Sequence, residues 1–167
     1  MVTSKSFIKT ILLTGLIAGT LDAAAASIKY LIDTNGGNPL KVWRYVAGVA
    51  FGPETKTKDL YAMAAWGLWF HYIIAMSFTL FFFLCYRPIR TVLTNKFAAG
   101  IGYGIFVWCV MSLLVLPIAN GENIGARLEK LVTMYKESLI AIGILIIAIG
   151  LPISLLADRY YSKKVPY

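Results

Sequence analysis

Long apolar blocks separated by short polar segments are the main pattern of this chain. Four blocks are long enough to cross a hydrocarbon core as helices, which takes about 20 residues. We expect these spans at residues 7–32, 60–86, 97–118 and 138–157. The predicted fold is therefore an all-α, integral membrane four-helix bundle, a single transmembrane domain covering residues 1–167.

The first block also has features of a secretory signal peptide. Lys5 and Lys9 precede its apolar run, and the AAAAS segment at 23–27 is similar to a small-residue cleavage site. Apolar residues continue through Ile32, however. We therefore expect a first span that is retained.

A short amphipathic helix is predicted between the first two spans. The turn residues at 33–37 end the first span, and Asn38-Pro39 is a typical helix start. The helix at 39–51 is too short to span, and Lys41 and Arg44 lie away from its apolar face. We expect it to lie in the membrane interface. The residues of its apolar face are Leu40, Trp43, Val46, Ala47 and Ala50.

The later boundaries follow from proline, glycine and charge. Arg87-Pro88-Ile89-Arg90 ends the second span, and a short loop is expected from there to Lys96. No glycine or proline occurs from Ala126 until Gly143, which predicts one continuous helix into the fourth span, and Pro152 predicts a kink. The outer part of that helix has an apolar stripe that predicts contact with a partner. The stripe consists of Leu128, Leu131, Val132 and Tyr135.

Composition supports a membrane protein. Hydrophobic residues make up 59% of the chain and charged residues 14%, against about 45–50% and about 25% in soluble domains. The net charge is +8, but no basic run alternates with aromatic residues, so nucleic acid is not an expected partner. The expected partners are membrane lipid and other membrane subunits or further copies of this chain.

Lysine and arginine are divided equally between the two sides of the predicted topology. The side with both termini carries Lys5, Lys9, Arg87, Arg90, Lys96, Arg159, Lys163 and Lys164; the other carries Lys29, Lys41, Arg44, Lys56, Lys58, Arg127, Lys130 and Lys136. The cations are denser in the short loop between the second and third spans. This favours termini in the cytoplasm.

Small residues mark two faces where helices could approach closely. Gly15 and Gly19 in the first span, and Gly100 and Gly104 in the third, are separated by three residues, as in small-xxx-small packing motifs. We interpret all four as helix-packing positions.

Asp22 and His71 are the residues most able to carry chemistry. Each lies about 15 Å from the end of its span at ~1.5 Å per residue, near the middle of the membrane. Trp108 and Cys109 reach a similar depth in the third span. An Asp22–His71 pair could relay a proton or bind an ion. The alternative is that Asp22 is protonated and packs by bonding to Thr14, Thr20, Ser27 or a backbone carbonyl.

Other chemistry has little support in the sequence. One Asp, one His and a Cys do not form a metal set, so no metal or other cofactor is expected. Ser77 lies on a poor face for a serine nucleophile beside His71. Cys85 and Cys109 differ too much in depth for a disulfide.

Four stretches of the chain carry a family resemblance: GLIAGTLDAAA, PLKVWRYVAGVAFGP, GLWFHYIIA and GIGYGIFVWCVMSLLVLPI. They resemble a family of small bacterial inner-membrane proteins without an assigned reaction, broadly related to the YagU-like group. The resemblance implies a bacterial source, the inner membrane and a four-helix fold.

Three hypotheses about function follow. The first is a non-catalytic accessory or structural subunit of a larger membrane assembly. The second is a small oligomeric proton-coupled transporter or channel that uses Asp22 and His71 in mid-membrane. The third, an enzyme acting on lipid, lacks a nucleophile and base, so we do not expect an enzyme.

Overall fold

The computed structural model describes residues 4–162, which are built from helices with no β-strand. The α-helices are α1 (Ser4–Asp33), α2 (Leu40–Phe51), α3 (Leu60–Leu84), α4 (Tyr86–Val92), α5 (Lys96–Val110), α6 (Leu116–Asn120), α7 (Ile124–Thr133), α8 (Tyr135–Leu145) and α9 (Leu151–Ser162). A 3₁₀ turn, η1, covers Pro53–Lys56, and two π-helical segments, η2 and η3, cover Met111–Val115 and Ile146–Gly150.

Four helical units of the described chain are long and apolar enough to cross a membrane. They are Ser6–Asp33, Leu60–Leu84, Lys96–Asn120 and Tyr135–Ser162. In each, only 28% of the most apolar window is buried inside the protein, so most of that apolar surface faces outward, as lipid contact requires. The predicted all-α fold with four spans is confirmed, and the fourth span is longer at both ends than expected.

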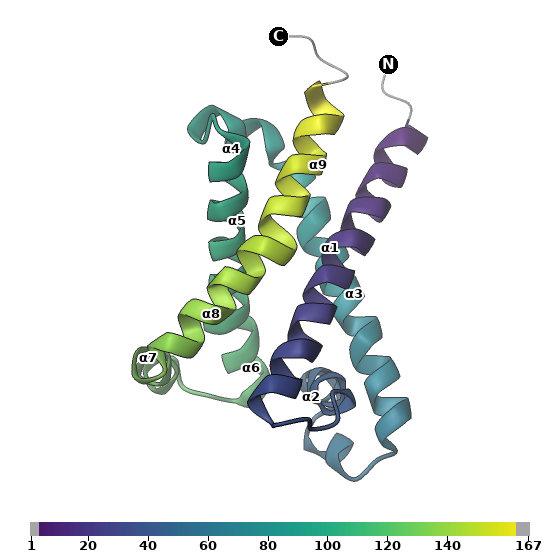
Figure 1. Ribbon diagram of the computed structural model, residues 1–167, viewed down its shortest axis with the longest axis vertical. Helices are drawn as coiled ribbons and strands as arrows, with labels where there is room; N and C mark the ends of the chain where they lie inside the picture. The colour runs from purple at the N-terminus through teal and green to yellow at the C-terminus, as the bar shows by residue number, and fades with distance from the viewer. Residues whose placement is uncertain (1–3, 163–167) are drawn as a thin grey trace.

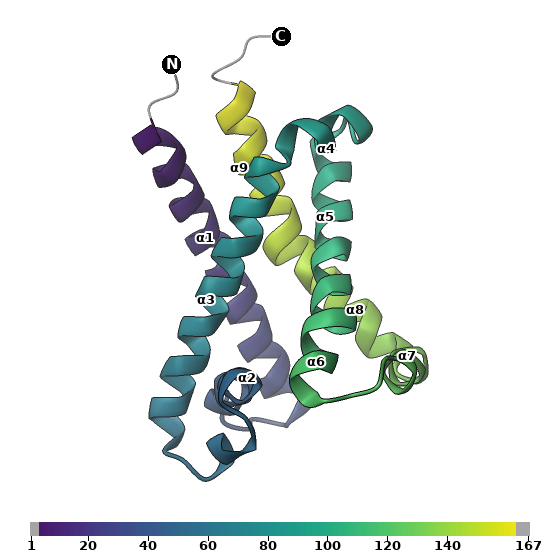
Figure 2. The same ribbon diagram turned by 180° about the vertical axis from the view of Figure 1, so that it is seen from behind.

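The two ends of the bundle differ in what they contain (Figure 1). The start of α1, the end of α9 and α4 lie at one end, which we call the terminal end. The opposite loop end holds α2, η1, α6 and α7, and both α2 and α7 lie across the direction of the spans (Figure 1 and Figure 2). The first and last described helical residues therefore lie at the same end of the bundle, which is compatible with the predicted placement of both termini on one side. Lys163, Lys164 and the side chain of Lys5 lie outside them.

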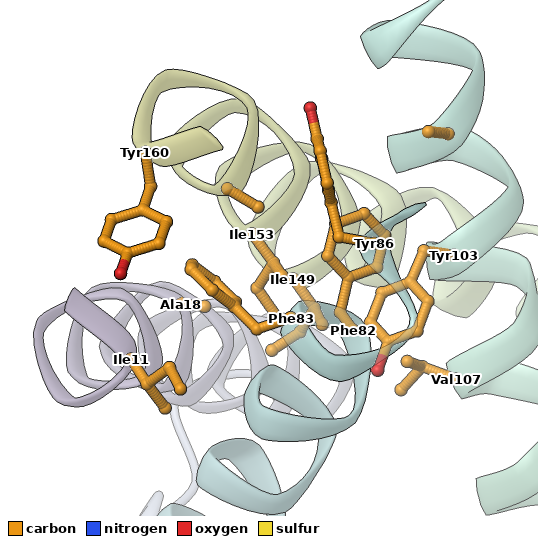
Figure 3. Packing of buried hydrophobic residues seen from close by; sticks show 12 residues of the cluster. Ile11, Ala18, Phe82, Phe83, Tyr86, Tyr103, Val107, Ile149, Ile153 and Tyr160 are labelled. Carbon is orange, nitrogen blue, oxygen red and sulfur yellow. The ribbon is translucent and has the colours of Figure 1, made fainter. Parts of the chain in front are cut away.

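The main core fills the terminal end. Aromatic side chains of α3 and α4 are enclosed by α1, α5, η3 and α9 (Figure 3). The Phe82 and Tyr103 rings pack edge to face at 4.6 Å, and Tyr86 stacks on Tyr161 at 4.4 Å. The buried members are Ile11, Ala18, Phe82, Phe83, Tyr86, Ala99, Tyr103, Val107, Ile149, Ile153, Ala157 and Tyr160.

Glycines let the third and fourth spans touch through their backbones. A Cβ built on Gly150 would lie 2.1 Å from the Gly100 carbonyl oxygen, and one on Gly104 would lie 2.6 Å from the Ile146 Cα. Any larger side chain there would push the helices apart. Gly100 and Gly104, two of the predicted helix-packing positions, lie at this contact, and Gly150 is a third glycine there that the sequence analysis did not name.

Each π-helical segment directly precedes a helix that has proline as its second residue. Proline lacks a backbone N–H and crowds the preceding turn, so the backbone widens to avoid it. In i→i+5 bonding the Ser112 carbonyl would face Pro117, which cannot donate. The Nε–H of Arg127 donates to that carbonyl instead, at 2.9 Å, and so ties α7 to the third span. Pro152 follows η3 in the same way, where the sequence predicted a kink.

The loop expected after the second span is partly helical. The chain turns at Cys85, and Tyr86–Val92 forms α4, in which Pro88 is the third residue. Proline is tolerated in the first turn of a helix because that N–H needs no intrahelical partner. The Arg87-Pro88-Ile89-Arg90 segment therefore ends the span by starting a new helix.

The predicted continuous helix into the fourth span is wrong. It breaks at Met134, with φ −99° and ψ 43°, and separates α7 from α8. The Ser138 hydroxyl lies 3.2 Å from the Leu131 carbonyl and donates to it, which satisfies a group left open by the break. A break without glycine or proline is stable here because a side chain replaces the missing backbone donor.

Candidate functional site

Asp22 and His71 meet because α1 and α3 approach closely along the predicted small-residue face. A Cβ on Gly19 would lie 3.1 Å from the Tyr72 ring, and one on Gly15 would lie 2.4 Å from the Met76 sulfur. Both glycines therefore lie against α3. Asp22 is three residues beyond Gly19, on the same face of α1.

The acid and the imidazole form an ion-pair contact. His71 Nδ1 lies 3.9 Å from Asp22 Oδ2, which is longer than a direct hydrogen bond. The side chains are 13% and 19% exposed, respectively. The other ring nitrogen, His71 Nε2, lies 2.9 Å from the Gly19 carbonyl oxygen. The structure thus brings together the two residues that were matched by depth.

The Gly19 contact defines the tautomer of His71. A carbonyl oxygen only accepts, so Nε2 must carry a hydrogen, and in the neutral ring Nδ1 then presents a lone pair to Asp22. That lone pair would be repelled by a carboxylate. One added proton, on either Asp22 or Nδ1, removes the repulsion and gives a pair with no net charge. The geometry is therefore complementary to one bound proton.

The helix predicted to lie in the interface covers this pair. The Trp43 ring contacts the His71 ring edge to face at 5.2 Å, and Trp43 is 7% exposed. A Cβ on Gly67 would lie 1.7 Å from the Trp43 carbonyl oxygen, so α2 rests directly on the backbone of α3. Ala47 is also fully buried. The apolar face of α2 thus packs on protein, through residues that the sequence placed on that face.

A hydroxyl pair beside the site was not predicted. Thr20 Oγ1 and Tyr72 Oη lie 2.9 Å apart, and the Tyr72 ring contacts the His71 ring edge to face at 5.6 Å. Thr20 is thus engaged with α3 and does not bond to Asp22. Within residues 4–162 neither Thr14 nor Ser27 bonds to Asp22 either. The signal for Tyr72 was its position directly after His71.

Other residues named for chemistry are not brought to this pair. Trp108 lines a hollow beside α7 and α8. Cys85 and Cys109 are both free thiols. Within the described part of the chain, no three His, Cys, Asp or Glu residues gather as metal ligands would.

The predicted apolar stripe lies on the surface of the loop end. Leu128, Val132 and Tyr135 are 47%, 73% and 56% exposed, and Leu131 is half-buried. With Trp108 and Leu139 they line a shallow hollow of about 530 Å³ between the third span and α7–α8. The stripe is therefore shared between α7 and the start of α8, and it faces away from the core.

Comparisons with models of protein families, with curated proteins and with solved structures found no match to this chain.

Proposed function

We propose that this protein binds and releases a proton at the Asp22–His71 pair, and that it acts as a small oligomeric proton-coupled transporter or channel. One observation supports this most: within residues 4–162 the hydrogen-bond and ion-pair contacts of Asp22 are limited to His71. Ionisable residues inside membranes commonly mark ion or proton pathways.

The contacts around the pair favour exchange of a proton over a fixed structural clamp. A carboxyl group used only for packing is expected to be saturated by several donors. Asp22 instead has one partner, at 3.9 Å, and keeps a fifth of its side chain exposed. Because either residue can hold the bound proton without a net charge, the pair can pass a proton between α1 and α3 at low electrostatic cost.

The test is proton flux in liposomes that contain the purified protein and a trapped pH indicator. Asp22→Asn keeps the shape of the side chain but cannot ionise, so the flux should be abolished. Asp33→Asn is the matched control, since Asp33 is an exposed acid at the end of the same helix. Flux that is equal in the two variants and the wild type would rule out the proposal.

A second measurement reads the pair directly. His71 is the single histidine of the sequence, so ¹⁵N-histidine labelling gives one imidazole in an NMR spectrum. We expect the neutral ring to carry its hydrogen on Nε2, and the chemical shift of Nδ1, which faces Asp22 at 3.9 Å, to change in Asp22→Asn. A spectrum that is unchanged by this substitution contradicts contact between the two groups.

The accessory-subunit hypothesis remains a second candidate, supported by the exposed stripe and its hollow. A photo-crosslinking amino acid at position 132 should then capture one defined membrane protein, whereas the same amino acid at lipid-facing position 84 should capture none. Val132 is 73% exposed and Leu84 is 65% exposed. Equal, diffuse labelling at both positions would show that the stripe contacts lipid.

We also propose that the protein lies in the bacterial inner membrane with its termini in the cytoplasm. The resemblance of the four sequence stretches supports this membrane, and the dense cations near α4 support the orientation. A reporter fused after Tyr167 that is active only in the periplasm should be silent. Activity of that reporter would reverse the orientation.

A further inference from the structure

A second polar feature lies at the loop end, far along the bundle from the main core. A hollow of about 540 Å³ opens between α2, η1 and the end of α6. Its cationic lining residues are Lys41 and Arg44 of α2 and Lys56 of η1. The first and third candidate spans end near this level, at Asp33 and Asn120, and the second begins there at Leu60 (Figure 2), so the hollow lies where the apolar segments stop.

The lining of the hollow is positively charged. No Asp or Glu is among its lining residues, and within residues 4–162 none of its three cations pairs with an acid. Three other cations at this end do have acid partners. Lys29 contacts Asp33 and Glu137, and Arg127 and Lys130 contact Glu122.

Short contacts fix the walls of the hollow. Thr55 is 3% exposed and its hydroxyl donates to the Gly52 carbonyl at 3.0 Å, which holds η1 in shape. A Cβ on Gly48 would lie 3.0 Å from the Thr55 hydroxyl oxygen, so η1 rests closely on α2. On the opposite wall the Asn120 amide donates to Tyr45 Oη at 3.3 Å.

Arg44 is also partly oriented. Its Nη1 donates to the Lys56 carbonyl at 3.4 Å, which leaves most of its guanidinium donors available. This contact keeps Arg44 beside η1, near the side chain of Lys56.

We propose that this hollow binds the phosphate of an anionic phospholipid headgroup. Guanidinium and ammonium groups are the usual donors to phosphate, and basic hollows between helices at the membrane boundary suit anionic lipid. The apolar lining, which includes Val49, Pro53 and Ala119, would face the glycerol and the first acyl carbons. The proposal is independent of the Asp22–His71 pair.

The test is native mass spectrometry of the full chain in detergent, titrated with dioleoyl phosphatidylglycerol or with dioleoyl phosphatidylcholine. We expect about tenfold tighter binding of the anionic lipid to the wild type, and loss of that preference in a triple variant of the hollow. A control triple removes the same charge from the same end outside the hollow and should keep the preference. The two variants are K41Q/R44Q/K56Q and K58Q/K130Q/K136Q.

Three results would overturn the proposal. Equal loss in both triple variants would mean diffuse surface attraction, and no headgroup preference in the wild type would mean no site. Displacement of the lipid by millimolar inorganic phosphate alone would identify free phosphate as the ligand. If the triple variant of the hollow does not fold, the exposed single variant Lys56→Gln should still lower the preference about threefold.

Discussion

Asp158 and Asp22 are about equally exposed, at 17% and 19% of their side chains, but their surroundings are opposite. Asp158, at the terminal end, accepts from the Tyr86 hydroxyl at 2.8 Å and lies 3.6 Å from Arg90 and 3.7 Å from Lys96. Asp22, in the half of the bundle toward the loop end, faces one histidine. Asp158 is thus surrounded by three donors that are always protonated. Asp22 faces one imidazole, and this pair has room for one shared proton.

The packing around the two acids differs in the same way. The terminal end has a large aromatic core whose hydroxyls reach backbone carbonyls, as in Tyr103 to Phe78 and Tyr161 to Phe83. In the described part of the chain, the buried apolar cluster beside Asp22 is smaller and consists of Ala23, Trp43 and Ala64, with partly buried residues packed against it. We therefore expect the packing at the terminal end to contribute more to the free energy of unfolding than the smaller core beside the Asp22–His71 pair. Four substitutions test this comparison.

Gly150→Ala should have the largest effect. Its Cβ would lie 2.1 Å from the Gly100 carbonyl oxygen. Because the atoms it meets belong to the backbone of α5, no side chain can move aside, and the third and fourth spans must separate. We expect a loss of about 3 kcal/mol in the free energy of unfolding, measured in detergent. Gly143→Ala in the same span is the control, because its Cβ would meet no atom of another helix within 4 Å. Equal stability of the two variants would contradict the close contact.

Gly67→Ala should act on the loop end alone. Its Cβ would meet the Trp43 carbonyl at 1.7 Å, and α2 can detach while the aromatic core stays intact. The expected loss is about 2 kcal/mol. Hydrogen exchange should rise in α2 and stay unchanged in α9. If exchange rises equally in both helices, the two ends are not independent.

Asp158→Asn should cost about 1.5 kcal/mol in the free energy of unfolding, because it removes charge from a carboxyl that accepts from Tyr86 and faces two cations. Thermal unfolding in detergent measures this. Restoring stability by a further Arg90→Gln substitution would support the charge pairing. An unperturbed single variant would show that these contacts add nothing.

Asp22→Asn should have the smallest effect on stability, within about 0.5 kcal/mol in the same unfolding measurement, because Asn can donate to the His71 lone pair. A loss as large as that of Asp158→Asn would mean that the pair is a structural clamp. The contrast between the two acids would then disappear.

The sequence predicted the parts of this fold that depend on hydrophobic length and residue size. The spans, the close-packing glycines and the depth match of Asp22 with His71 follow from apolar blocks and the rise of a helix. The break at Met134 could not be predicted, since it depends on Ser138 reaching back to the Leu131 carbonyl after the chain has folded. The contact of Trp43 with His71 depends likewise on how α2 docks at Gly67.

The separation of Asp22 and His71 along the chain also affects how the protein enters the membrane. The first span leaves the ribosome well before α3 is made, so Asp22 must partition into the bilayer without its imidazole. An isolated aspartate at the centre of a helix costs about 2.5–3.5 kcal/mol for insertion through the translocon. The leucines and isoleucines that α1 leaves exposed, such as Leu12, Leu16 and Ile17, favour insertion and offset this cost. The exposed apolar side chains of α1 thus keep insertion of this helix favourable before α3, which contains His71, has been made.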